Sequence, residues 1–166
     1  MASKRLAFLR HAKSSWNEPD LDDFDRPLNR RGQRAATRMG QHMKDEGLRP
    51  ELVLCSAALR TRQTLERLDL PDGVAVCVEP GLYGASATAL FDRVRRIEDG
   101  IATVLMIGHN PGMHDAVAGI LAPDEASPPE FPTAALAITQ LTVEHWQDVR
   151  PGIARLEAFT IPRSLD

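Results

Sequence analysis

The chain has 166 residues, with 20 Lys plus Arg against 23 Asp plus Glu and a formal net charge of −3 at pH 7. This length can bury one sizeable core, so we expect a single domain over residues 1–166. The slight acidity argues against a general binder of nucleic acid or anionic membranes, which requires a positive field. Because 17 of the 20 basic residues are arginine, local pockets for phosphate or carboxylate groups are compatible with this balance. A coding bias toward arginine explains the excess equally well.

The first apolar run of the chain is short. Residues 6–9 are four apolar residues after Lys4 and Arg5, whereas a secretory signal needs roughly 7–15 and a membrane helix about 20. Cys55 and Cys77 lie singly in apolar runs and form neither a disulfide framework nor a zinc motif. We therefore expect a soluble, cytoplasmic protein with reduced cysteines and no membrane contact.

Strand-like and helix-like segments alternate along the sequence. In chain order we predict a strand over 6–9, a helix over 31–46, a strand over 52–55, a helix over 60–68, a strand over 74–78, a helix over 87–97, a strand over 103–107, a helix over 113–121 and a strand over 136–143. This order predicts an α/β fold with one mostly parallel sheet flanked by helices.

Residue spacing supports these assignments. The first four strand-like runs are continuously apolar, which is typical of buried strands. Residues 136–143 alternate between apolar and polar, which favours a strand near the sheet edge. Ala35, Met39 and Met43 share one helical face. Residues 125–132 contain three prolines, which indicates a loop.

Charged and polar residues follow three of the predicted strands. Arg10 and His11 come after the first strand, Ser56 and then Arg60 after the second, and His109 after the strand over 103–107. Ligands of open α/β sheets bind outside the carboxyl ends of the strands, so we expect these residues to share one rim. Arginine, neutral histidine, a hydroxyl group and helix N-terminal amides together suit a phosphoryl group.

Four segments then resemble, in order, the motifs of the histidine phosphatase (phosphoglycerate mutase-like) superfamily. Residues 9–17 resemble its Arg-His-Gly signature, residues 25–32 its Arg-Pro-Leu element, residues 56–64 its Ser-Pro-x-x-Arg-x-x-x-Thr block, and residues 107–112 its second-histidine motif. The compact length and the Arg-His-Ala and Gly-His-Asn-Pro sequences are most similar to the SixA-type phosphohistidine phosphatase branch. The resemblance implies a three-layer α/β/α fold.

The resemblance also implies catalytic roles for four residues. His11 would be the nucleophile that takes the phosphoryl group, and Arg10, Arg60 and His109 would bind its oxygens. A nucleophilic histidine must be neutral, and neighbouring arginines disfavour its protonated form. The same arginines stabilise charge on the transferring group, so we expect no metal and no other cofactor.

Five further residues are weaker candidates for substrate binding. Asn17 and either Ser14 or Ser15 match the first motif, and Tyr83 follows a strand near the rim. Arg26 either binds substrate or pairs with one of its acidic neighbours in the sequence.

The sequence departs from the family at two positions. Ala12 stands where glycine is usual, and Gly84 stands where mutase-like members carry a general-acid glutamate. General-acid catalysis is typically worth ~10²–10⁴ in rate, and cleavage of a phosphate ester depends on it more than cleavage of a phosphoramidate. Glu79, or a carboxylate from residues 20–25, could replace the missing acid.

These features predict a metal-independent phosphatase whose partner is a phosphohistidine-bearing signalling protein. No long insertion is present to close over a small substrate, residues 17–26 being the one candidate. A broad phosphomonoesterase acting on phosphorylated small molecules is the alternative enzyme. A phosphoprotein-binding module with negligible turnover is the alternative outside enzymes. We expect no binding of nucleic acid.

Overall fold

The computed structural model describes residues 3–166 and contains one six-stranded sheet. Its strands are β1 (Lys4–Arg10), β2 (Leu52–Ser56), β3 (Ala75–Glu79), β4 (Thr103–Gly108), β5 (Leu136–Leu141) and β6 (Ala154–Thr160). Its α-helices are α1 (Arg30–Asp45), α2 (Leu59–Leu68), α3 (Ala87–Val94) and α4 (Gly112–Ile120). Within the described residues, no helix has the length and apolar character needed to cross a membrane.

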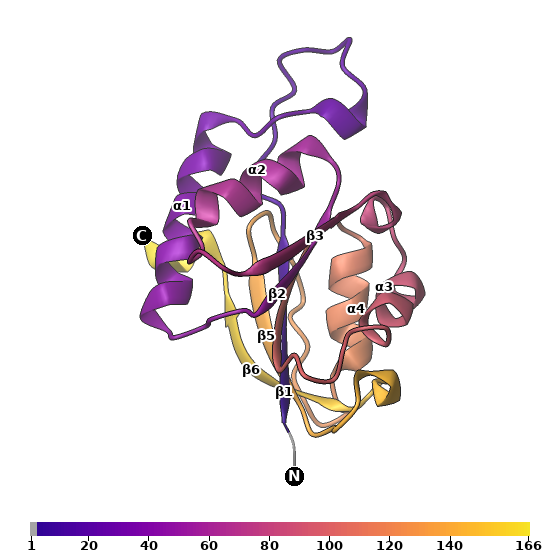
Figure 1. Ribbon diagram of the computed structural model, residues 1–166. Helices are drawn as coiled ribbons and strands as arrows, with labels where there is room; N and C mark the ends of the chain where they lie inside the picture. The colour runs from indigo at the N-terminus through magenta and orange to yellow at the C-terminus, as the bar shows by residue number, and fades with distance from the viewer. Residues whose placement is uncertain (1–2) are drawn as a thin grey trace.

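The strand order across the sheet is β3-β2-β4-β1-β5-β6. The pairs from β3 through β1 are parallel, and β1/β5 and β5/β6 are antiparallel. This confirms the predicted α/β fold with a mixed, mostly parallel sheet. The carboxyl ends of β1, β2 and β4 meet at the end of the sheet opposite the N-terminus (Figure 1).

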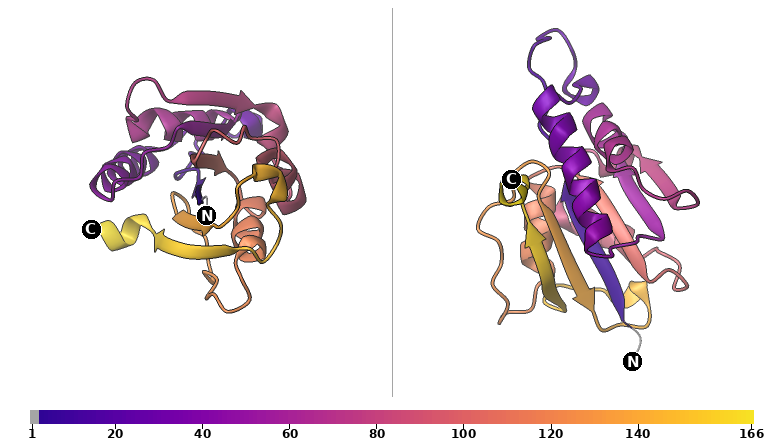
Figure 2. Two further views of the ribbon diagram at one scale, coloured as in Figure 1. Left: turned by 60° about the horizontal axis from the view of Figure 1, so that its bottom comes forward. Right: turned by 90° about the vertical axis from the view of Figure 1, so that its left-hand side faces the viewer.

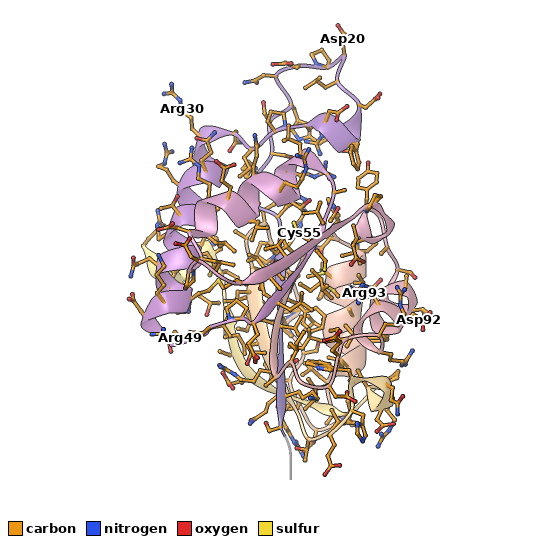
Figure 3. All side chains as sticks on the ribbon, in the orientation of Figure 1. Asp20, Arg30, Arg49, Cys55, Asp92 and Arg93 are labelled. Carbon is orange, nitrogen blue, oxygen red and sulfur yellow. The ribbon has the colours of Figure 1, made fainter. Side chains whose placement is uncertain are left out.

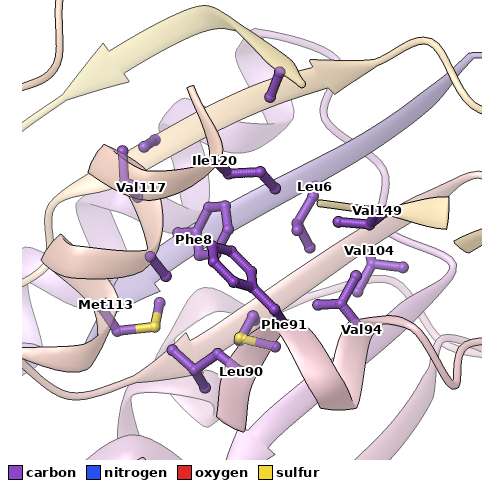
Figure 4. Packing of buried hydrophobic residues seen from close by; sticks show 14 of the residues in the cluster. Leu6, Phe8, Leu90, Phe91, Val94, Val104, Met113, Val117, Ile120 and Val149 are labelled. Atoms are coloured by element: carbon purple, nitrogen blue, oxygen red, sulfur yellow. The ribbon is translucent and has the colours of Figure 1, made fainter. Parts of the chain in front are cut away.

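Helices pack on both faces of the twisted sheet (Figure 2). Strand alternation explains the two layers, because Leu6 and Phe8 of β1 face one side while Ala7 and Leu9 face the other. The Phe8 side joins the core formed with α3 and α4, where Phe91 and Met113 are buried (Figure 4). The Leu9 side joins the core formed with α1 and α2.

Two strands differ from their predicted positions. The strand predicted over 74–78 is not buried: β3 is an edge strand that pairs only with β2, and Val76 and Val78 are exposed. The strand predicted near the edge, over 136–143, is instead the interior strand β5 between β1 and β6. Its polar residue Thr139 is tolerated inside because its hydroxyl donates to the Leu6 carbonyl oxygen at 2.8 Å.

Strand β6 was not predicted from the sequence. It forms the second edge of the sheet and carries polar side chains in alternation, with Glu157 paired to Arg5. This polar alternation is typical of an edge strand and, in hindsight, is its sequence signal.

Two glycines of α1 allow close backbone contacts. A Cβ atom at Gly32 would lie 2.1 Å from the Lys13 carbonyl oxygen, and one at Gly40 would lie 2.2 Å from the Leu68 carbonyl oxygen. Distances this short leave no room for any side chain, and both obstacles are backbone atoms. Glycine is therefore required where α1 meets the segment after β1 and where it crosses the end of α2.

We expect Gly40→Ala to lower the free energy of unfolding by about 1–3 kcal/mol, because overpacking forces the two helices apart. Alanine has the higher helix propensity, so a loss must come from packing. Gly119→Ala in α4 is the matched control, since its new Cβ would contact Phe91 at an ordinary 3.5 Å. Urea unfolding of both variants measures the difference. Equal stabilities would contradict the close-packing explanation.

Candidate active site

Two histidines lie side by side at the carboxyl ends of the central parallel strands. His11 follows β1 and His109 follows β4, and the ring centroids are 5.2 Å apart. The His11 amide donates to the Gly108 carbonyl oxygen at 3.0 Å, which continues the β1/β4 pairing past the end of the strands. Both side chains are buried.

The His11 ring is held as a neutral imidazole with one free nitrogen. Its Nδ1 lies 2.7 Å from the Ala12 carbonyl oxygen, which can only accept, so the ring proton sits on Nδ1. Burial, with smaller contributions from His109, Arg60 and Arg10, lowers the pKa of His11 to about 3 despite that hydrogen bond. The lone pair of Nε2 is therefore available for nucleophilic attack at neutral pH.

His109 is oriented by Ser56 at the end of β2. The His109 Nε2 atom lies 2.7 Å from Ser56 Oγ, which itself accepts the Ala58 N–H at 3.3 Å. A Ser56 hydroxyl that donates to Nε2 leaves the His109 ring proton on Nδ1. Burial, followed by the charge of Arg60, lowers the pKa of His109 to about 4.

Two nitrogen atoms of this cluster are buried without a partner in residues 3–166. They are His109 Nδ1 and Arg10 Nε. Buried donors are nearly always satisfied in folded proteins, so an orphaned pair in one cluster indicates an absent acceptor. A phosphoryl oxygen is an acceptor of the required charge.

The arginines supply the positive charge. Arg10 is held by its Nη1, which donates to the Phe131 carbonyl oxygen at 3.1 Å. Arg60, in the first turn of α2, is buried and places its Nε 3.4 Å from His11 Nε2. Burial and the neighbouring Arg60 lower the pKa of Arg10, so an anion bound between them would relieve unfavourable charge.

The cluster contains one carboxylate, that of Asp23. It accepts from Arg60 Nη2 at 2.9 Å, from Arg26 Nε at 3.1 Å and from the Tyr83 hydroxyl at 2.6 Å. The Tyr83 hydrogen bond, with those from Arg60 and Arg26, holds the pKa of Asp23 well below its usual range. The side chain is therefore an anion at every pH at which the protein would work.

The structure brings most of the weaker candidates to this cluster. The Tyr83 ring packs edge-on against the His109 ring, with centroids 5.4 Å apart. Arg26 is buried and pairs with Asp23, and its Nη1 donates to Ser14 Oγ at 2.6 Å. Of the two alternatives predicted for Arg26, the structure shows the ion pair with an acidic neighbour.

Two candidates lie away from the cluster. Asn17 is exposed, and its backbone N–H donates to Ser15 Oγ at 3.1 Å. Both residues lie in the segment that leads away from the rim. Within residues 3–166, neither side chain forms a hydrogen bond with His11 or His109.

No carboxylic acid is available where the family usually places one. Gly84 has a φ of +67°, and no atom lies within 4 Å of the position a Cβ would take. Glu79 is held by Arg93, whose Nε and Nη2 both donate to its carboxylate at 2.8 Å. Within residues 3–166, no three His, Cys, Asp or Glu side chains gather as a metal-binding group.

Sequence reasoning placed Ser56 at the rim without a role of its own, and it did not single out Thr64 or Asp23. Ser56 and Thr64 lie in the third motif, and Thr64 Oγ1 accepts the Ala12 N–H at 3.0 Å beside His11. The position of Thr64 in that motif was the signal that could have found it. Asp23 could not be singled out, because it is one of several acidic residues in a short stretch.

We expect the imidazole signals of His11 and His109 not to titrate between about pH 5 and 8, because burial keeps both rings neutral. The exposed His145 is the internal control, since its hydrogen bond to Asp99 raises its pKa above the usual value. NMR titration of the ring protons measures all three. A midpoint within that range for His11 or His109 would contradict the neutral site.

Comparison with known proteins identifies a family for this chain. The model of the histidine phosphatase superfamily (branch 1) matches residues 6–87. An uncharacterised protein of Mycobacterium tuberculosis is 37% identical over 163 residues, which cover 93% of this chain and 100% of the relative. Phosphohistidine phosphatase SixA of Escherichia coli is 36% identical over 147 residues, which cover 82% of this chain and 85% of SixA.

Solved structures give the same result. A structure from Nakamurella multipartitia, provisionally assigned as the phosphohistidine phosphatase SixA, superposes with a TM-score of 0.87 at 26% identity and covers 98% of both chains. The protein histidine phosphatase SixA complexed with tungstate superposes with a TM-score of 0.76 at 27% identity, covering 98% of this chain and 99% of that one. The chain belongs to the histidine phosphatase superfamily.

Proposed function

We propose that this protein removes the phosphoryl group from phosphohistidine on a partner protein through a phospho-His11 intermediate. Membership of the superfamily supports phosphatase or mutase-like chemistry. The observation that carries the proposal is the neutral His11 ring, whose proton lies on Nδ1 and whose unprotonated Nε2 lies 3.4 Å from Arg60 Nε.

The reaction has two steps. In the first, the His11 Nε2 lone pair attacks phosphorus, and the phosphorus–nitrogen bond of the substrate breaks as its electron pair returns to the leaving imidazole. In the second, a water molecule attacks phosphorus and loses a proton to solvent. The bond from phosphorus to Nε2 then breaks, and inorganic phosphate leaves.

The two arginines and His109 stabilise both steps. Arg10, Arg60 and the Nδ1–H of the neutral His109 ring are the donors for the phosphoryl oxygens. Positioned charges and hydrogen-bond donors of this kind supply most of the catalysis in phosphoryl transfer. Ser56 acts indirectly, since its hydrogen bond orients the His109 ring.

The lack of a general acid supports phosphohistidine as the substrate. Gly84 has no carboxylate, Glu79 is paired with Arg93, and Asp23 is held ionised by three donors. An alkyl phosphate needs a proton on its leaving oxygen. A phosphohistidine that carries a proton on its other ring nitrogen leaves as neutral imidazole and needs none from the enzyme.

Two relatives support a protein partner. SixA of Escherichia coli bears the name of a phosphohistidine phosphatase, and the tungstate-bound relative is described as a protein histidine phosphatase. His11 follows β1 and therefore lies at the rim. This rim is formed by strand ends and loops at one end of the sheet (Figure 1). We propose that a phosphorylated histidine on a second protein reaches this rim, that the whole chain acts as one domain, and that the reaction needs no metal.

We expect a phosphohistidine peptide to be cleaved at least about tenfold faster in kcat/KM than an alkyl phosphate, with p-nitrophenyl phosphate between them, because leaving groups that need less protonation react faster. His11→Ala should lose about 10³-fold or more on all three substrates. The exposed His145→Ala serves as control. Turnover is measured with and without chelator.

Each other outcome has a defined meaning. Equal rates on the alkyl phosphate would reveal an acid and favour a broad phosphomonoesterase. Stoichiometric phosphate binding without turnover would favour a binding module. Loss of activity with chelator would contradict a metal-independent reaction.

Arg60→Ala should lower kcat/KM by about 10²–10³-fold, the typical cost of removing one donor to a developing charge. Arg62→Ala is the matched control, because Arg62 lies on the same helix two residues later, is exposed, and donates only to the Ala57 carbonyl oxygen. Steady-state kinetics on p-nitrophenyl phosphate compare the two variants. Similar losses in both would indicate a general effect of surface charge.

A further inference from the structure

An acidic side chain occupies the cationic end of the candidate site. The two terminal nitrogens of Arg60 are both engaged by Asp23: Nη2 donates to its carboxylate at 2.9 Å, and Nη1 to its main-chain carbonyl oxygen at 2.6 Å. The Tyr83 hydroxyl donates to the same carboxylate oxygen as Arg60. The only remaining Arg60 nitrogen, Nε, faces His11 Nε2.

A phosphoryl group attached to His11 would need these same donors. The Arg60 guanidinium is the cation that contacts His11 Nε2, so phosphoryl oxygens on that atom fall within its reach. Two anions on one guanidinium repel each other and share a fixed number of N–H donors. The Asp23 carboxylate and a phosphoryl group are therefore competitors for Arg60.

The segment that carries Asp23 is able to move away. We call residues 17–26 the strap; it projects from the rim, with Asp20 at its tip (Figure 3). Residues 17–23 are all exposed. Besides the contacts of Asp23, two residues hold the strap. The Phe24 ring packs edge-on against Tyr83 with centroids 5.0 Å apart, and the buried Arg26 anchors the end of the strap by donating to Ser14 Oγ at 2.6 Å. Residues 17–25 have few buried contacts of their own, so their release is inexpensive.

We propose that Asp23 is a positioning residue that takes the place of the phosphoryl group on Arg60 and Tyr83 in the empty site and is displaced when a phosphoryl group binds. The inference deepens the function proposed above and rests on it for the identity of the substrate. When no phosphoryl ligand is bound, the Asp23 carboxylate keeps the Arg60 guanidinium and the Tyr83 hydroxyl in position. After hydrolysis its return to Arg60 helps to expel inorganic phosphate.

The competition has a quantitative consequence. Asp23→Asn removes the negative charge but keeps the shape of the side chain, so every phosphoryl ligand should bind more tightly by the same factor. We expect the inhibition constant of inorganic phosphate and the KM of p-nitrophenyl phosphate to fall together, by about tenfold or more. The value of kcat should fall less, and only as far as slower phosphate release limits turnover.

Asp25→Asn is the matched control. Asp25 lies in the same short 3₁₀ turn, is exposed, and its side chain makes no hydrogen bond in residues 3–166. It loses the same charge without losing a contact to Arg60, so its constants should change less than about twofold, as for a screened surface charge. Asp23→Ala, which removes both carboxylate oxygens, should shift the constants in the same direction as Asp23→Asn.

Hydrogen exchange gives a second readout that a purely structural role would not produce. Vanadate binding should increase amide exchange over residues 17–25 of the unsubstituted protein, since the strap is released. In Asp23→Asn, exchange in this segment should already be high and should not respond to vanadate. Protection of the strap by vanadate would overturn the proposal, because it would mean closure over the ligand.

The kinetic outcomes separate the remaining explanations. A fall in kcat confined to the alkyl phosphate would identify Asp23 as a general acid and overturn the proposal. An unchanged or weaker phosphate affinity in Asp23→Asn would do so as well. Vanadate affinity measured by calorimetry requires no turnover, so this inference is tested even if phosphohistidine is not cleaved.

Discussion

The parallel pairing of β1 with β4 is the constraint on which the candidate site depends. It sets the two strands in register to their last residues, Arg10 opposite Gly108, and so delivers His11 and His109 to the same point. The hydrogen bond from the His11 amide to Gly108 extends this register into the loop. Both strands are buried on both faces by the two helix layers. The distance between the histidines is thus set by the buried centre of the sheet.

The candidate site is positively charged, although the chain as a whole is negatively charged. The protein has a formal net charge of −3, yet it gathers Arg10, Arg26 and Arg60 around two neutral histidines. Such a group of buried and half-buried cations is costly without an anion. The Asp23 carboxylate lessens that cost, and a phosphoryl group would be suited to do the same. The same electrostatic demand therefore accounts for the folding of the strap onto the rim and for the phosphoryl ligand proposed above.

The parallel half of the fold can be predicted from the sequence, because its signals lie within short segments of the chain. Apolar runs such as residues 6–9 and 103–107 end in charged or glycine residues, so both the strand and the position of the site can be recognised. Which strands form the edges of the sheet was harder to predict. β3 is an edge strand yet is as apolar as an interior one, whereas β5 is interior and tolerates Thr139 because of a hydrogen bond to distant Leu6. Asp23 was indistinguishable from its acidic neighbours, because its partners come from α2 and from the loop after β3.

The close contact between Gly32 and Lys13 links helix α1 to the backbone that holds the His11 ring. The amide nitrogen of Lys13 belongs to the same peptide plane as the Ala12 carbonyl that fixes the His11 proton on Nδ1. A Cβ at position 32 would fall 2.8 Å from that nitrogen as well as 2.1 Å from the Lys13 oxygen. A side chain there would displace the Lys13 backbone, which is joined to the carbonyl that accepts from His11 Nδ1. Glycine at position 32 therefore leaves room for this peptide from the first turn of α1, without itself contacting the histidine.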